Sequence, residues 1–89
     1  MPRIVFGQAL QRHIKCPPVE VAAGTLREAL DAAFQIHSGA RSYVLDDQKH
    51  VRKHISVFVD GRMIRDRTRL AEAVSPASEI LIVPALSGG

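Results

Sequence analysis

The chain has 89 residues, of which 46% are hydrophobic and 4% aromatic, and its formal net charge is +3. This length predicts one domain with a single modest core, in which about 60 to 65% of the unfolded chain's surface becomes buried. No apolar run approaches the ~18 residues of a membrane-spanning helix, and the single cysteine, Cys16, cannot form an internal disulfide. These features argue against a membrane protein and against secretion, and we expect a soluble cytoplasmic protein.

Basic side chains are concentrated in the middle third of the chain, where interleaved aspartates dilute the positive charge. Such a cluster either meets an acidic partner or forms a solvated face that keeps a small domain soluble, and we favour the solvated face. A nucleic-acid interface is disfavoured, because few aromatic side chains are available to stack on bases. The basic residues concerned are Arg41, Lys49, Arg52, Lys53, Arg62, Arg65, Arg67 and Arg69.

The N-terminal part of the chain predicts a hairpin followed by a helix. Residues 2–7 contain a β-branched and aromatic run, and residues 19–21 alternate apolar and polar side chains, so we expect two paired strands. Thr25, followed three residues later by Glu28, has the pattern of a capping box at a helix start. Gly39 is expected to end this helix in a left-handed conformation. The helix's apolar stripe comprises Leu26, Ala29, Leu30, Ala33 and Phe34.

The middle of the chain predicts a loop and a second hairpin. Residues 41–54 are polar and mixed, so we expect a loop there, with a short strand at 43–45. Residues 55–59 are β-branched and aromatic and predict a strand. The Asp-Gly pair at 60–61 is typical of a tight hairpin turn, after which residues 63–64 form the returning strand.

The C-terminal part predicts a short helical turn at 70–74, ended by Ser75-Pro76, and then a strand at 80–83. This last run is continuously apolar, so we expect a central strand buried on both faces, with the first strand as its parallel neighbour. One helix is available to cover one face of the sheet. The predicted fold is therefore α+β, a mixed sheet of four to five strands with one main helix on one face.

The chain ends in Ser87-Gly88-Gly89, which carries almost no side-chain bulk. Two glycines allow the backbone to extend fully and to pass through a channel too narrow for larger residues. By itself, such an ending also describes a frayed terminus or an expression remnant. The apolar strand directly before it favours a functional tail.

Three segments together resemble the β-grasp sulfur carriers of the ubiquitin superfamily, and the resemblance covers nearly the whole chain. That family includes the small subunit of molybdopterin synthase, the thiamine sulfur carrier and the cysteine-forming carrier. The chain departs from it in the turn at 75–79, where an acidic, glycine-containing turn is common, and in Ser87, where alanine is more usual. Its long segment at 41–54 resembles the larger cysteine-forming or thioquinolobactin-type carriers. The matching segments are Gly24-Thr25-Leu26, Val57-Phe58-Val59-Asp60-Gly61 and Ile80-Leu81-Ile82-Val83-Pro84-Ala85-Leu86-Ser87-Gly88-Gly89.

The resemblance implies a ubiquitin-like β-grasp domain over residues 1–84 and a flexible reactive tail over 85–89. It implies that a partner enzyme uses ATP and Mg²⁺ to adenylate the Gly89 carboxylate, and that sulfide or a sulfurtransferase persulfide then displaces AMP to leave a thiocarboxylate. The chain would be a carrier rather than an enzyme, would bind no cofactor and would give its sulfur to a downstream enzyme. The sulfur acceptor stays open. The resemblance implies that Ala85, Leu86 and Ser87 line the partner's channel. Gly88 and Gly89 would permit entry of the tail, and Pro84 would stiffen its root by restricting φ.

We expect the partner to dock on the sheet face opposite the helix, because one helix cannot cover both faces. Phe58 is the candidate contact, with Val57 and Val59 turned toward the core. Arg62 and Arg65, near the same hairpin, either meet acidic groups on the activating enzyme or are simply solvated.

The remaining chemically active side chains predict no further site. His50 and His54 are spaced like metal ligands only if they lie on a helix, and the strand that follows argues against one, so we expect no metal. His13 and His37 are expected at the surface or bonded to the backbone. Cys16, next to a lysine, either has a lowered pKa or, as is more common for a lone cysteine, is inert.

The tail also fits a ubiquitin-like modifier, in which activated Gly89 forms an amide with a target lysine. Both functions begin with adenylation, so the tail does not separate them. A lysine-linked adduct that depends on Gly89 favours the modifier. A third alternative, a binding module that uses the basic middle third, predicts an affinity that falls steeply with salt and ignores tail truncation.

Overall fold

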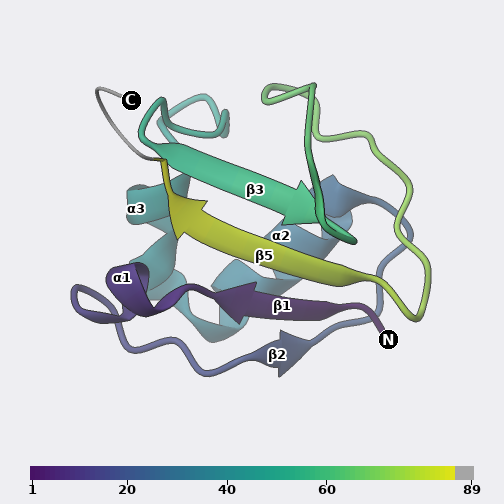
Figure 1. Cartoon of the computed structure of the whole chain (residues 1–89), viewed down its shortest axis with the longest axis horizontal. Helices are drawn as coiled ribbons and strands as arrows, with labels where there is room; N and C mark the ends of the chain where they lie inside the picture. Colours follow the sequence, from purple (N-terminus) through teal and green to yellow (C-terminus); the bar gives the residue numbers. More distant parts are fainter. Residues whose placement is uncertain (86–89) are drawn as a thin grey trace.

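The computed structural model describes residues 1–85 and contains five strands and three α-helices in that range. The strands are β1 (Arg3–Phe6), β2 (Val19–Glu20), β3 (Ile55–Val59), β4 (Arg62–Met63) and β5 (Glu79–Pro84), and the helices are α1 (Gln8–Gln11), α2 (Leu26–Ile36) and α3 (Arg41–Val44), with a 3-10 turn, η1 (Ser38–Ala40). The strands form one sheet in the order β2-β1-β5-β3-β4, and α2 lies across one face of it (Figure 1). The predicted α+β class, a mixed sheet with one main helix, is confirmed.

Helix α2 begins at the predicted capping box. The Thr25 hydroxyl accepts a hydrogen bond from the backbone N–H of Glu28 at 3.2 Å, and the Glu28 carboxylate accepts from the N–H of Thr25 at 3.2 Å. A cap of this kind stabilises a helix by about 1 kcal/mol.

No helix within residues 1–85 combines the length and the apolar character needed to cross a bilayer.

The core lies between α2 and the sheet face that it covers. Alternate residues of the three central strands point to it, and burial of each large aliphatic side chain contributes about 1.5–3 kcal/mol. The predicted parallel pairing of β1 with the last strand is confirmed, since Ile4 is the partner of Ile80. The sheet contributes Ile4, Phe6, Ile55, Val57, Val59, Ile80 and Ile82, and the helix contributes Leu26, Ala29, Leu30, Ala33 and Phe34.

Strand β5 is central, as predicted, but the prediction that both of its faces are buried is wrong. Ile80 and Ile82 are fully buried, whereas Leu81 and Val83 are only half-buried. The reason is visible in Figure 1, where α2 and α3 lie behind the sheet and leave its front face open.

Two predictions for the segment after α2 are wrong. Gly39 does not end the helix in a left-handed conformation, because α2 stops at Ile36 and Gly39 lies within η1. The chain then continues into α3 instead of a strand at 43–45. Ala40 and Val44 are both buried, and their spacing of four residues places them on one side of a helical turn. Only Leu45 forms a β-bridge, with Val51.

Residues 70–74 do not form the predicted helical turn. Leu70 has a φ of 56° and its side chain is fully buried. The carbonyl of Leu70 accepts from the N–H of Arg27, and that of Glu72 from the N–H of Leu26, both at 2.8 Å. These two donors belong to the first turn of α2, which has no partners for them within the helix. The segment is therefore shaped by a distant helix end.

The loop between β1 and β2 contains α1, which the sequence did not predict. The Gln11 side chain holds this loop, because its amide donates to the carbonyls of Phe6 and Cys16 and its oxygen accepts from the Cys16 N–H at 3.1 Å. Leu10 is buried in the core. Hydrogen bonds from one polar side chain therefore hold this loop, where a tight hairpin would use backbone hydrogen bonds between its strands.

The second hairpin forms at the predicted Asp-Gly turn. Asp60 and Gly61 have φ values of 52° and 82°, which suit a two-residue hairpin loop. The returning strand β4 starts at Arg62, one residue earlier than predicted. The Asp60 carboxylate accepts from the Ser78 hydroxyl and from the Glu79 N–H, both at 2.9 Å, and so connects this turn to the start of β5.

Candidate functional site at the last strand and the open sheet face

Strand β5 is the last element of the described chain and ends directly before the predicted tail. Pro84 is the register partner of Ile55, and the N–H of Ala85 donates to the carbonyl of His54 at 2.7 Å. The backbone is therefore attached to the sheet as far as Ala85. The predicted tail residues Leu86, Ser87, Gly88 and Gly89 lie outside the described residues, and their roles stay predictions.

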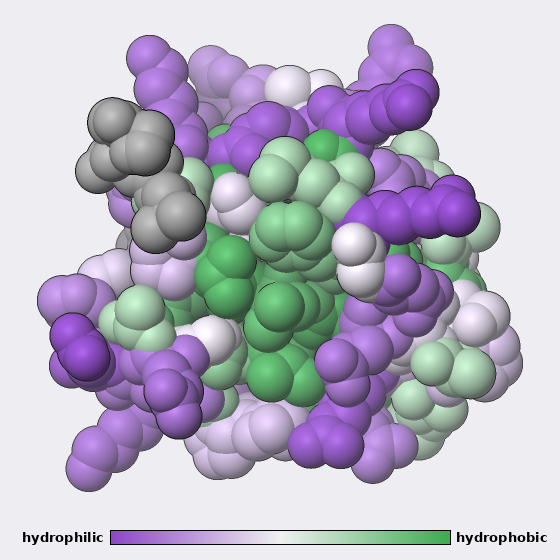
Figure 2. All heavy atoms as spheres, in the orientation of Figure 1, coloured by the Kyte–Doolittle hydropathy of each residue, from purple (hydrophilic) through white to green (hydrophobic). Residues whose placement is uncertain are grey.

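The open face of the sheet presents a row of apolar side chains. Leu81 is the register partner of both Val5 and Phe58, and Phe58 is in turn the partner of Met63, so the four side chains follow one another across β1, β5, β3 and β4. Met63 is 55% exposed. Figure 2 shows a hydrophobic area in the middle of this face, bordered by hydrophilic side chains. An apolar area that residues 1–85 leave uncovered is typical of an interaction surface.

The orientation predicted for β3 is confirmed. Phe58 is half-buried on the open face, and its neighbours Val57 and Val59 point into the core. Its role as a docking residue stays a prediction.

A groove of about 410 Å³ joins this apolar row to the start of the tail. It brings Phe58 together with Pro84 and Ala85, three residues that the sequence proposed separately. Met63 and Val83 were not proposed, although strand alternation places them on the same face as Phe58 and Leu81. The groove is lined by Ser56, Phe58, Met63, Val83, Pro84 and Ala85.

Gly7 supports this groove from the end of β1. Its N–H donates to the carbonyl of Ile82 at 2.8 Å, and a Cβ at this position would lie 2.7 Å from Cγ1 of Val83. Only glycine lets the end of β1 approach the last strand so closely. The close packing of Val83 against the end of β1 therefore requires a glycine at position 7.

The structure does not bring Arg62 onto the open face. Arg62 is the register partner of Val59, whose side chain points to the opposite side, and residues directly opposite one another share a face. Arg65 is exposed, and its backbone N–H donates to the Glu72 carboxylate at 3.3 Å. Within residues 1–85, neither guanidinium makes a hydrogen bond or ion pair, so both roles stay predictions.

Two other arginines of the middle third bind backbone carbonyls. The Arg67 guanidinium donates to the carbonyls of Arg52 and Ile55, and Nε of Arg52 donates to the carbonyl of Ser42 at 2.7 Å. Outside this third, the Arg27 side chain donates to the carbonyl of Thr68. Part of the basic cluster therefore connects loops, which weakens its interpretation as a docking surface.

Two aspartates of this region anchor turns through their carboxylates. Hydrogen bonds from the backbone N–H groups of Arg69 and Thr68, and from the Thr68 hydroxyl, lower the pKa of Asp66. The backbone N–H of His50 is the main cause that lowers the pKa of Asp46. Both carboxylates stabilise local backbone geometry.

The structure assigns no reactive role to the lone cysteine or to the histidines. Cys16 is 2% exposed, and burial raises the pKa of its thiol, so the alternative of a lowered pKa is wrong. His13 is exposed and stacks on Tyr43. Nε2 of His37 is buried without a hydrogen-bond partner among the described residues, contrary to the prediction for it. No group of three or more metal-ligating side chains lies within residues 1–85.

Solved structures with this architecture come from archaea and bacteria. Small archaeal modifier protein 1 of Haloferax volcanii is 26% identical, with a TM-score of 0.80, and the match covers 99% of this chain and 98% of that one. A chain of the BexX/CysO complex of Amycolatopsis orientalis is 24% identical, with a TM-score of 0.78 and full coverage of both chains. Small archaeal modifier protein 1 of Methanosarcina acetivorans has a TM-score of 0.78 at 18% identity, over 99% of this chain and 95% of that one. The last two similarities concern the fold alone.

No curated protein sequence is similar enough to count as a match. The model of the ThiS family, in contrast, matches residues 9–89, which include the groove and the whole tail. This match and the structural neighbours confirm the predicted resemblance to ubiquitin-like β-grasp carriers and modifiers. The chain belongs to the ThiS family.

Proposed function

We propose that this protein is a sulfur carrier whose Gly89 carboxylate is activated by a partner enzyme and converted to a thiocarboxylate. Membership of the ThiS family supports a small carrier or modifier rather than an enzyme. The observation that carries the proposal is the groove on the open sheet face, which is lined in part by Pro84 and Ala85, the last described residues before 86–89. A partner that covers the groove is thereby placed next to the tail.

The chemistry requires activation, because a carboxylate is a poor acyl donor at neutral pH. The partner enzyme, with Mg²⁺, transfers AMP from ATP to the Gly89 carboxylate and releases pyrophosphate. Sulfide attacks the acyl carbon and expels AMP, which leaves the thiocarboxylate directly. When the terminal sulfur of a sulfurtransferase persulfide attacks instead, the product is an acyl disulfide, and a thiol must then attack the enzyme-side sulfur and reduce the S–S bond to release the thiocarboxylate. The thiocarboxylate formed is a sulfur nucleophile for a downstream enzyme.

The geometry suits delivery of the carboxylate into another protein. The hydrogen bond from Ala85 to His54 holds the start of the tail, and the residues beyond it, 86–89, span at most about 13–14 Å when fully extended. Gly88 and Gly89 can pass through a narrow channel, and Pro84 restricts φ where the tail begins. The chain contributes reach and docking, and the partner contributes ATP, Mg²⁺ and catalysis.

Docking is proposed to use the row of apolar side chains from Val5 to Met63. Removal of such side chains from water is the main driving force of most protein association. The Amycolatopsis neighbour was solved as a complex, which supports partner binding by this fold.

Intact mass spectrometry tests the proposal. The full chain is incubated with its cognate activating enzyme, ATP and a sulfur source, and the expected product has one terminal oxygen replaced by sulfur. Deletion of Gly89 serves as the control, with circular dichroism to show that the domain stays folded. Equal reaction of the truncated chain would overturn the proposal.

The second candidate function is a covalent protein modifier. It is favoured by one observation, the 26% identity to a protein named as a small archaeal modifier. In this case the activated Gly89 forms an amide with a lysine of a target. Recovery of lysine-linked adducts from cells, present with Gly89 and absent without it, would establish the modifier and distinguish it from the carrier.

A further inference from the structure

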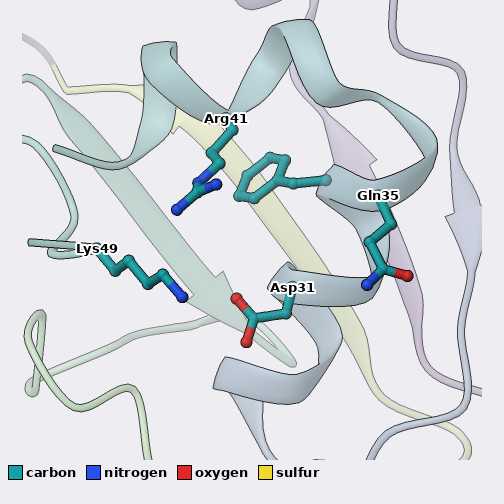
Figure 3. A pocket seen from close by; sticks show the side chains of 5 residues that line it. Asp31, Gln35, Arg41 and Lys49 are labelled. Atoms are coloured by element: carbon teal, nitrogen blue, oxygen red, sulfur yellow. The ribbon is translucent and has the colours of Figure 1, made fainter. Parts of the chain in front are cut away.

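A pocket on the helical side of the molecule, away from the open sheet face, is lined by charges of both signs. Its volume is about 240 Å³, and Asp31, Arg41 and Lys49 point toward one another around it (Figure 3). Gln35, one helical turn after Asp31, and the ring of Phe34 complete the lining. Nothing in the proposed sulfur chemistry uses this pocket.

The backbone fixes all three charged residues. Asp31 lies in the middle of α2, and Arg41 is the first residue of α3. Lys49 has a φ of 63° in a turn where its N–H donates to the carbonyl of Asp46 at 3.0 Å. The Asp46 carboxylate further accepts from the N–H groups of Gln48 and His50. The charges therefore come from three separate elements with well-defined backbones.

These charges face one another without pairing. Within residues 1–85, the side chains of Asp31, Arg41 and Lys49 make no hydrogen bond and no ion pair within 4.0 Å. The neighbouring charged groups Arg52 and Asp46 are, in contrast, hydrogen-bonded to backbone atoms. The space between the three unpaired groups suits a ligand that carries both charges.

The size and charge of the lining define the ligand. The volume equals roughly eight liquid-water molecules at about 30 Å³ each, and it is below the ~300–1,000 Å³ of pockets for drug-sized molecules. Two cations and one carboxylate are balanced by two carboxylates and one ammonium group. The guanidinium of Arg41 matches a carboxylate in a two-point contact, and Phe34 provides an apolar floor for a methylene group. An acidic amino acid has this composition and this size.

We infer that the pocket binds an acidic α-amino acid such as L-aspartate. Arg41 and Lys49 hold its two carboxylates, and Asp31 accepts from its ammonium group. The inference does not depend on the chemistry at Gly89, because no step proposed there uses a residue that lines this pocket.

The test is a titration of the ¹⁵N-labelled full chain with L-aspartate, followed by NMR at constant ionic strength. The expected result is a saturable shift of the amides of Asp31, Phe34, Arg41 and Lys49. Two analogues of L-aspartate test the contribution of single charges: succinate lacks the ammonium group, and L-asparagine lacks one carboxylate. Each should bind about three- to fivefold more weakly, as expected for the loss of one ion pair at an exposed site.

Substitutions separate recognition from general electrostatics. Asp31→Asn should abolish the preference for aspartate over succinate, and Lys49→Gln should weaken aspartate binding about threefold. Lys53→Gln is the matched control, because Lys53 is also an exposed lysine but does not line this pocket. All three side chains are exposed, so folding is expected to be preserved. Absence of saturable shifts, equal binding of succinate, or an equal effect of Lys53→Gln would overturn the inference.

Discussion

The two faces of the sheet differ in how far other parts of the described chain cover their side chains. On the helical side, α2 and the loops cover the core, and many polar groups bind backbone atoms, as Asp66 and Arg67 do. On the open side, the row from Val5 to Met63 has no covering element within residues 1–85 (Figures 1 and 2). The helical side therefore accounts for stability, and the open side is available to a partner. The following predictions test this division.

The largest expected effect is a difference in unfolding free energy between substitutions at two adjacent residues of β5. Ile82→Ala should lower the free energy of unfolding by about 2–5 kcal/mol, because this fully buried side chain would leave a cavity. Leu81→Ala, on the open face, should cost about 1.5 kcal/mol or less, since that side chain is only half-buried. Urea unfolding measures both values. If Ile82→Ala does not fold, Ile82→Val should still cost about 0.5–1.5 kcal/mol. Equal costs for Leu81→Ala and Ile82→Ala would contradict the division.

The next prediction concerns the close approach of β1 to the last strand. Gly7→Ala should destabilise the protein by about 1–3 kcal/mol, because the added methyl group meets Val83 at 2.7 Å. Gly39→Ala is the control, since a Cβ there has no neighbour within 4 Å, and it should be neutral or stabilise by up to about 1 kcal/mol. Thermal unfolding compares the two. A neutral Gly7→Ala would show that Val83 moves aside freely.

Two neighbours on β4 test whether docking follows the face of the sheet. Met63→Ala should leave stability nearly unchanged and weaken binding to the activating enzyme about fivefold or more, as expected for an interface residue worth over 1 kcal/mol. Arg62→Gln should change affinity less, because its register places it on the other side. Calorimetric titration with the enzyme gives both affinities. A larger loss for Arg62→Gln would mean that the hairpin edge docks instead.

The smallest effect is a pH dependence on the helical side. Hydrogen bonds lower the pKa of Asp66 below its ordinary value of 3.8, so its stabilising contribution is fully present above that pH. The contribution is lost as the pH falls through the lowered pKa. Asp66→Asn should therefore be slightly less stable at neutral pH and should lose less stability on acidification. Urea midpoints measured across this acidic range test the prediction, and identical curves for both proteins would argue against it.

Parts of the fold that depend on neighbouring residues were predictable. The capping box at Thr25, the turn at Asp60 and Gly61, and the alternation of residues 55–59 use hydrogen bonds and side-chain spacing within a few residues. The segment at 70–74 was wrong because it depends on a distant contact, since the carbonyls of Leu70 and Glu72 accept from the first turn of α2. Helix α1 was missed for another reason: side-chain hydrogen bonds from Gln11 to residues five positions away hold its loop, and apolar periodicity does not reveal them.

The candidate site was predicted in part for the same reason. Phe58 and Pro84 were proposed from strand alternation and from the family resemblance. The contribution of Gly7 became apparent only from the approach of β1 to Val83, two segments far apart in the chain. The separation of Arg62 from Phe58 required the pairing register of the hairpin, which a shift of one residue reverses.

The sequence by itself determined the α+β class, the start of the main helix, the second hairpin and the family resemblance, because each rests on short-range patterns. Only the tertiary structure decided that one face of β5 stays open, that the groove meets the start of the tail, and that Asp31, Arg41 and Lys49 converge. The physical reason is that local propensity acts along the chain, whereas burial and register arise when remote segments pack together.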